Sequence, residues 1–300
     1  PNLCNAAWNP PMPQNKSTNR MSKIFTTAVI KLNGESIMEL EDIVNRIAEL
    51  IPVIDSTTDI QVRNRRNKRP YVKGVATLFE PQFTKELVRC WSSESPNELS
   101  WINDEHPYPN SRDTCDLVIT GSTVEVDFGS FEWAIELKFL RLVGNNGNNN
   151  DYVMQKAISP FLKDRSLVHD VEKLKMATFG KRKAVIFYGF DYNLDSVNHA
   201  EKMCQTIIDS IGNSEYYVEN PEELDKFLQD DLIPTPKNLG RVIRSVDKHG
   251  DVYSLESVTE IIDAFMSING IASKGPVVAT FSGLNRHPCG QFGRVVGWEL

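Results

Sequence analysis

The run FEWAIELKFLR at 131–141 has the alternation of a β-strand, and it restricts the fold more than any other stretch of the chain. Side chains alternate between the two faces of a strand, so residues two apart point the same way, about 6–7 Å apart. The odd-numbered residues from 131 to 139 are all apolar and predict a buried face. Glu136 and Lys138 share the other face with Ala134 and Leu140, which indicates a sheltered acid–ammonium pair. The ordinary alternative is an outer strand with one wet, charged face.

Composition limits the class of protein. The chain of 300 residues can form one large domain or two modest ones, and 40% hydrophobic with 24% charged residues is ordinary for a globular protein. No apolar run approaches the ~18 residues of a membrane span and no signal-peptide pattern is visible, so we expect no membrane partner. Five scattered cysteines lack the spacing of a zinc site and favour a reducing, cytoplasmic location. A net charge of −7 still allows a local basic surface.

Periodicity and turn residues predict a mixed α/β chain whose strands cluster early. A helix is expected over 34–52, ended by Pro52, and residues 93–114 are expected to form a polar, proline-containing connection. The continuous apolar run at 183–190 predicts a strand covered on both faces. The other expected elements are helices at 81–92, 151–159, 164–178, 195–211, 221–230 and 255–268, and strands at 115–120, 123–129, 276–283 and 293–300.

Asp116 opens a predicted strand twenty positions before Glu136, with room between them for one strand and a turn. The returning strand can therefore bring Asp116, Glu136 and Lys138 into one site. Two carboxylates with a backbone carbonyl, assigned to Leu137, suit a hard divalent cation, Mg²⁺ or Mn²⁺. Such a cation polarises a phosphodiester, and a neighbouring lysine can orient or activate the attacking water and stabilise negative charge.

These residues resemble the PD-(D/E)XK nuclease superfamily, which has the restriction-endonuclease-like fold. Asp116 matches the acid of the first motif, although Cys115 stands where a proline is usual, and Glu136-Leu137-Lys138 matches the (D/E)XK triplet. The predicted order of elements over 35–190 is similar to the αβββαβ core of that superfamily. The resemblance implies a Mg²⁺-dependent endonuclease that acts on DNA, in restriction or another defence role.

Three parts are expected along the chain. Residues 1–20 are rich in Pro and Asn and precede Met21, which reads as a natural start, so they are assigned to a leader or disordered segment. Residues 21–192 form the nuclease-like core with a basic segment at 61–73. Residues 193–300 form a more helical C-terminal part with a terminal strand pair packed on the core.

Some nucleases of the superfamily add an acid from the first helix, and Glu41 is the candidate here because apolar residues surround it at helical spacing. The alternative is a boundary residue on an amphipathic helix. Gln155 follows the catalytic strand where related nucleases sometimes place a supporting polar residue. Ser159 stands where the exonuclease pattern has a tyrosine, so the role of Gln155 stays open.

A basic run without acids is the candidate nucleic-acid contact, since several cations can neutralise phosphates and give salt-dependent affinity. The alternative is a solvated loop. We expect double-stranded DNA as the partner, and a homodimer because double-strand cutters often use two copies of one site. The run contains Arg63, Arg65, Arg66, Lys68, Arg69 and Lys73, and a second, thinner set contains Lys237, Arg241, Arg244 and Lys248.

Two other functions remain open at this point. A protein of the same fold could bind nucleic acid or act as a scaffold without catalysis, and metal-linked stabilisation would distinguish the two. A hydrolase using His287 and Cys289 would need the two side chains to meet in space with a third group orienting the base. Pro288 between them favours a structural turn.

Overall fold

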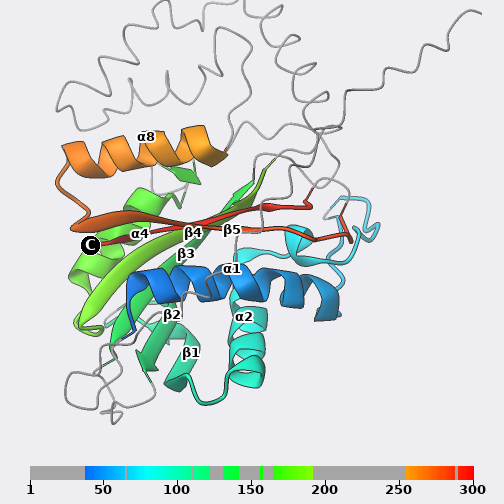
Figure 1. Ribbon diagram of the computed structural model, residues 1–300, viewed down its shortest axis with the longest axis horizontal. Helices are drawn as coiled ribbons and strands as arrows, with labels where there is room; N and C mark the ends of the chain where they lie inside the picture. The colour runs from blue at the N-terminus through cyan, green and yellow to red at the C-terminus, as the bar shows by residue number, and fades with distance from the viewer. Residues whose placement is uncertain are drawn as a thin grey trace, which may run out of the picture.

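In the computed structural model, the strands of the described residues lie in one mixed sheet of order β1-β2-β3-β4-β6-β5 (Figure 1). The structure describes residues 38–64, 66–109, 111–121, 131–141, 156–157, 165–191, 255–287 and 290–300. Helices α1 and α2 pack on one face of the sheet, and α4 and α8 pack on the other. The strands are β1 Leu99–Pro107, β2 Thr114–Gly121, β3 Trp133–Arg141, β4 Arg182–Phe190, β5 Lys274–Phe281 and β6 Gly293–Glu299. The helices are α1 Leu40–Thr57, the short 3-10 turn η1 Val75–Thr77, α2 Glu80–Glu94, α4 Leu167–Met176 and α8 Leu255–Ile268.

β3 lies in the interior of the sheet and has the two faces that the alternation predicts. Trp133, Ile135, Leu137 and Phe139 belong to the core under α1 and α2. Ala134 and Leu140 belong to the core on the other face, so Glu136 and Lys138 have buried neighbours on both sides along the strand. Only 2% of Glu136 and 5% of Lys138 is exposed, which excludes the outer strand with a wet face.

The prediction is wrong at the start of this run. Phe131 precedes β3 and packs in the cluster under α4 and α8, not with Trp133. Its neighbour Glu132 accepts backbone hydrogen bonds from Met38 and Gly121, both at 2.9 Å. Alternation holds only where the backbone is extended, and the regular strand begins at Trp133.

β2 and β4 flank β3 in different directions. β2 runs antiparallel to β3, whereas β4 runs parallel to it. A parallel pair needs a crossover connection, and α4 lies in that connection, packed on both strands. β1 to β3 therefore form an antiparallel series, followed by a helix and a strand parallel to β3. The strands predicted at 115–120 and 183–190 and the helices predicted at 81–92, 164–178 and 255–268 are confirmed, and no end differs by more than three residues.

Two predictions about local structure are wrong. The connection expected at 93–114 contains β1, which escapes notice because an edge strand has one open side and tolerates polar residues and a terminal proline. The helix expected over 34–52 begins at Leu40 and runs past Pro52 to Thr57. The added turn is retained because Ile54 is fully buried and the Asp55 carboxylate accepts the backbone N–H of Val75 at 2.9 Å.

The C-terminal strand pair is part of the main sheet. β6 pairs antiparallel with β4, and β5 forms the outer edge beside it. The strand expected at 123–129, the helices expected at 195–211 and 221–230 and all but two residues of the helix expected at 151–159 lie outside the described residues.

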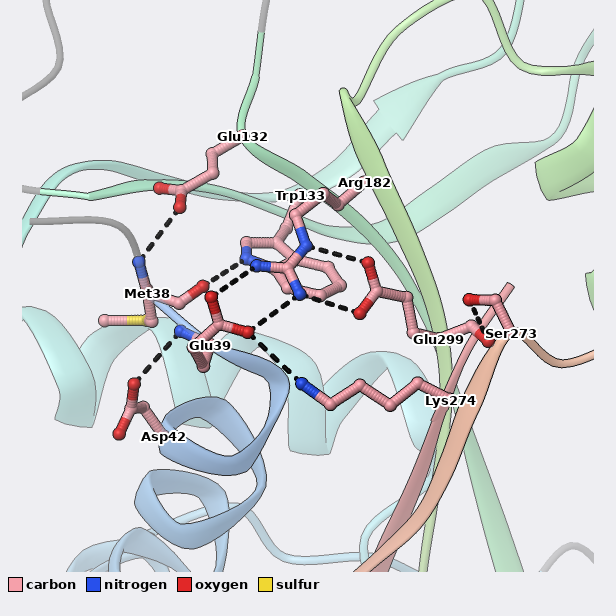
Figure 2. A network of polar contacts seen from close by, with 9 residues as sticks. All are labelled: Met38, Glu39, Asp42, Glu132, Trp133, Arg182, Ser273, Lys274 and Glu299. Carbon is pink, nitrogen blue, oxygen red and sulfur yellow. Dashed lines mark hydrogen bonds and ion pairs between the residues drawn. The ribbon is translucent and has the colours of Figure 1, made fainter.

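A network around Arg182 joins the first residues of β3 and β4 to β5, β6 and the start of α1 (Figure 2). The guanidinium of Arg182 donates to both oxygens of Glu299 at 2.8 and 2.7 Å and to both oxygens of Glu39 at 3.1 and 2.9 Å. It also lies over the ring of Trp133, 4.1 Å from its centroid. Lys274 adds an ion pair to Glu39 at 3.4 Å. We call these five residues the Arg182 network.

Candidate functional site

A cleft of about 1060 Å³ lies beside the second half of β3. Its walls come from the start of α2, the residues before and within β2, and α4. Its lining is rich in charged groups, with five carboxylates and six cationic side chains. The carboxylates are Glu80, Asp113, Asp116, Glu136 and Asp170, and the cationic residues are Arg112, Lys138, Arg141, Lys156, Arg165 and Lys173.

The structure brings Asp116 and Glu136 together across β2 and β3. The register of the two strands pairs Leu117 with Ile135, so one further step places Asp116 opposite Glu136. The Asp116 carboxylate accepts the backbone N–H of Leu137 through Oδ2 at 2.8 Å. The N–H and C=O groups of one strand residue point toward the same neighbouring strand. The Leu137 carbonyl therefore points toward β2, as the Leu137 N–H does, at a position beyond the last paired residues of β2 and β3.

Lys138 lies among carboxylates from two helices. Its Nζ is 2.8 Å from Asp170 Oδ2 on α4 and 3.5 Å from Glu80 Oε2 at the start of α2. Glu80 also accepts the backbone N–H of Phe139 at 3.0 Å, which fixes the carboxylate against β3. The ammonium of Lys138 is therefore held from both faces of the strand end, with only 6% of its side chain exposed.

Glu136 has two partners that the sequence did not indicate. The Tyr108 hydroxyl donates to Glu136 Oε1 at 2.6 Å, and Lys173 Nζ lies 3.1 Å from the same oxygen. Lys173 also pairs with Asp170 Oδ1 at 2.9 Å, one helical turn before it on α4. The i, i+3 spacing of Asp170 and Lys173 was visible in the sequence, but nothing in it showed that this face of the helix covers β3.

Glu41 does not join the site. Its side chain is exposed near the start of α1 and is not among the residues that line the cleft. The reason is the placement of α1, which packs along β5 and β6 and not over the end of β2. The helical acids beside Lys138 are Asp170, from α4, and Glu80, from α2, which precedes the strands in the chain.

Burial and crowding of like charges shift the acids of the cleft. Burial raises the pKa of Asp116 to about 6, against hydrogen bonds and the Lys138 ammonium, which lower it. Burial also raises the pKa of Glu136 well above its ordinary value, and the carboxylates of Asp116 and Asp170 add to the shift. A cation near both acids would favour their charged forms.

Lys138 and Lys173 are both held as ammonium ions. Burial alone would lower the pKa of each, but neighbouring carboxylates outweigh it and raise both values: Asp170 and Glu80 for Lys138, Glu136 and Asp170 for Lys173. A lysine with a raised pKa does not readily give up its proton and so rarely has a free amine to act as a base. Lys138 is therefore suited to stabilising negative charge.

The basic run forms an irregular hairpin away from these residues. Arg63 bridges to Pro70, and the Tyr71 N–H donates to the Val62 carbonyl at 2.9 Å. Arg66, Lys68 and the other described cations of the run are at least partly exposed, and none of them is among the residues lining the cleft. Lys73 pairs with Asp59 at 3.2 Å. Arg65 lies outside the described residues.

The remaining sequence candidates divide into two groups. His287 is buried and does not line the cleft, and its proposed partner Cys289 lies outside the described residues. Gln155 and the second basic set at 237–248 also lie outside them. Among the helices in the described ranges, none combines the length and the apolarity needed to cross a membrane.

Comparison of the chain with family models, curated proteins and solved structures finds no match. In the described ranges, no group of three or more His, Cys, Asp or Glu side chains is arranged to hold a metal ion. The ammonium of Lys138 lies between the carboxylates of Asp170 and Glu80, and that of Lys173 lies between those of Glu136 and Asp170.

Proposed function

We propose that this chain is a Mg²⁺-dependent nuclease, also active with Mn²⁺, that hydrolyses phosphodiester bonds in DNA. The observation that carries the proposal is the pairing of Asp116 and Glu136 across neighbouring strands, with the Lys138 ammonium on the same strand at the wall of one polar cleft. A restriction or defence role follows from family analogy alone.

The topology supports the PD-(D/E)XK proposal. Three antiparallel strands, a crossover helix and a strand parallel to the third follow helices α1 and α2, in an order similar to the one that the resemblance implies. Asp116 lies on the second strand and the Glu136–Lys138 pair on the third.

The donors near Asp116 fit a hard divalent cation. Asp116 and Glu136 offer carboxylate oxygens, and the carbonyl of Leu137 faces the same side, beyond the β2–β3 ladder. Mg²⁺ accepts one or two carboxylates and keeps several waters, so three ligating side chains are not required. When bound, the cation would polarise the scissile phosphate and help to form the attacking hydroxide.

The charges around Lys138 and Lys173 also support the proposal. Four carboxylates (Glu80, Asp116, Glu136 and Asp170) lie around these two ammonium groups. Burial raises the pKa values of Asp116 and Glu136, and a bound divalent cation would favour their charged forms.

The chain's own residues would bind and stabilise the substrate. Lys138 donates to the phosphate oxygen on which negative charge grows, which is the role of a preorganised cation in the transition state. Arg112 and Arg165 are exposed among the lining residues and can contact the phosphates on either side.

The experiment is hydrolysis of supercoiled, linear and single-stranded DNA with and without Mg²⁺ or Mn²⁺, comparing wild type with Asp116→Asn. We expect metal-dependent cleavage and metal-linked thermal stabilisation that both disappear in Asp116→Asn. DNA binding without cleavage and without metal-linked stabilisation would favour the inactive binding or scaffold protein. Light scattering on the same sample tests the proposed homodimer.

The hairpin at 61–73 is proposed as a DNA contact outside the cleft. Neutralising Arg65, Arg66 and Arg69 together should weaken binding to all sequences. The slope of log K against log salt should become shallower by about 0.9 for every phosphate that is no longer neutralised. Fluorescence anisotropy between about 50 and 200 mM salt measures both the affinity and the slope. An unchanged slope would leave the hairpin as a solvated loop.

A further inference from the structure

Lys173 occupies the position beside Glu136 that a bound cation would need. Its Nζ lies 3.1 Å from Glu136 Oε1 and 2.9 Å from Asp170 Oδ1. The ring of Tyr108 lies 5.9 Å from the ammonium, and the Tyr108 hydroxyl donates to the same Glu136 oxygen. Lys173 thus supplies positive charge to the most buried acid of the cleft.

The two lysines of the cleft are held differently. Lys138 extends from a central strand, has 6% of its side chain exposed, and contacts one carboxylate from each of two helices. Lys173 extends from α4 with 32% of its side chain exposed. A lysine on a helix surface can move its ammonium by rotating four side-chain bonds, whereas the buried Lys138 cannot move away without breaking both of its ion pairs.

Asp170 gives Lys173 a second point of attachment. The pair are one helical turn apart on α4, so the contact does not depend on Glu136. An ammonium that leaves Glu136 can therefore keep its bond to Asp170 and stay in the cleft, where it can meet a phosphate oxygen.

We propose that Lys173 is an internal counter-ion that holds Glu136 while the cleft lacks a metal and is displaced from Glu136 when the metal binds. This inference rests on the proposed nuclease function, because it requires that Glu136 bind a divalent cation. Its consequence is that Lys173 opposes metal binding and stabilises the metal-free protein.

The test is titration of full-length protein with Mg²⁺ and with Mn²⁺ alone, followed by calorimetry and by thermal unfolding. In Lys173→Met the competing ammonium is gone, so the Kd for metal should fall by about tenfold, the size usual for changes to groups that contact metal ligands. The melting temperature without metal should fall and that at saturating metal should recover. The matched control is Lys175→Met on the same helix, where Lys175 pairs with Glu172 at 3.5 Å, outside the cleft, and it should keep the wild-type Kd.

A second variant keeps the positive charge and tests the inference even if Lys173→Met fails to fold. Lys173→Arg offers a two-pronged donor to Glu136 and should hold it more firmly, so the Kd for metal should rise. Metal binding by wild type with an unchanged or higher Kd in Lys173→Met would overturn the inference and leave the nuclease proposal intact. Failure of the folded wild type to bind either metal would overturn both.

Discussion

The Arg182 network and the cleft are two clusters of charge beside opposite ends of β3, and they differ in burial and in their ratio of acids to cations. In the Arg182 network two cations meet two carboxylates, Arg182 and Lys274 against Glu39 and Glu299. The Glu39 side chain is 49% exposed, so water shares the cost of holding the charges. Around Lys138 and Lys173 in the cleft, four carboxylates share two ammonium groups, and three of these six groups are 6% exposed or less.

The difference separates a structural cluster from a candidate functional one. Balanced, hydrated ion pairs that join several strand ends need no ligand to explain them. Buried acids that share few cations have raised pKa values in the free protein, and a bound cation would favour their charged forms. The following experiments ask whether the two clusters differ in this way.

The largest expected effect is on catalysis. Lys138→Ala should lower cleavage by between about a hundredfold and about a thousandfold, the cost of removing one group that stabilises transition-state charge. Lys138→Arg should also be poor, because the guanidinium is bulkier and forks its donors. Lys175→Ala, on the exposed side of α4, serves as the control. Wild-type rates in both Lys138 variants, measured on one substrate, would place the chemistry elsewhere.

The next effect is on stability. Asp170 pairs with both lysines and is 3% exposed, so Asp170→Asn removes the carboxylate that Lys138 and Lys173 share. Breaking a buried pair from one side should lower the free energy of unfolding by about 3 kcal/mol. Urea denaturation measures it at neutral pH. A loss below about 1 kcal/mol, the size usual for surface pairs, would erase the distinction between the two clusters.

The sequence predicted the two strand faces and the approach of Asp116 to Glu136, because both depend on short stretches of the chain. A period of two fixes the faces of 133–140, and the length of chain between Asp116 and Glu136 allows a return to the neighbouring strand. The buried strand at 183–190 could likewise be predicted from its own residues alone.

The features that the sequence did not predict depend on how separate elements pack. Helical spacing gave Glu41 an apolar setting, but it did not indicate which strands α1 covers. It therefore did not show that Glu80, from α2, is the acid of the first two helices that lies beside Lys138. Asp170 and Lys173 could be placed on one helix face, but only the crossover packing of α4 brings that face to Glu136. β1 is an edge strand with few buried residues, so it carries almost no alternation to read.

In the Arg182 network, the geometry of the contacts should contribute more to the stability of the fold than the positive charge does. Arg182→Lys keeps the positive charge but gives up the two bidentate contacts to Glu39 and Glu299 and the stacking on Trp133. We expect a loss of about 1 kcal/mol in the free energy of unfolding. DNA cleavage by this variant should match wild type, because none of the five residues lines the cleft. A cleavage defect in folded Arg182→Lys would mean that the Arg182 network also affects the cleft.

The smallest effect is a pH dependence at Glu39. Hydrogen bonds from Arg182 lower the pKa of Glu39 below its ordinary value of 4.5, in spite of partial burial, and Lys274 adds to the shift. A carboxyl whose pKa is lower in the folded state stabilises the fold above its unfolded pKa, and that contribution disappears as pH falls through the folded value. Wild type should therefore exceed Glu39→Gln in stability by less than about 1 kcal/mol at pH 7, because the pair is half exposed. This difference in stability should stay constant down to a pH of about 4.5 and disappear below it.

Urea midpoints of the two proteins at a series of pH values measure this difference in stability directly. A difference that persists at the acid end of the series would mean that Glu39 acts through packing at the start of α1 and not through its charge.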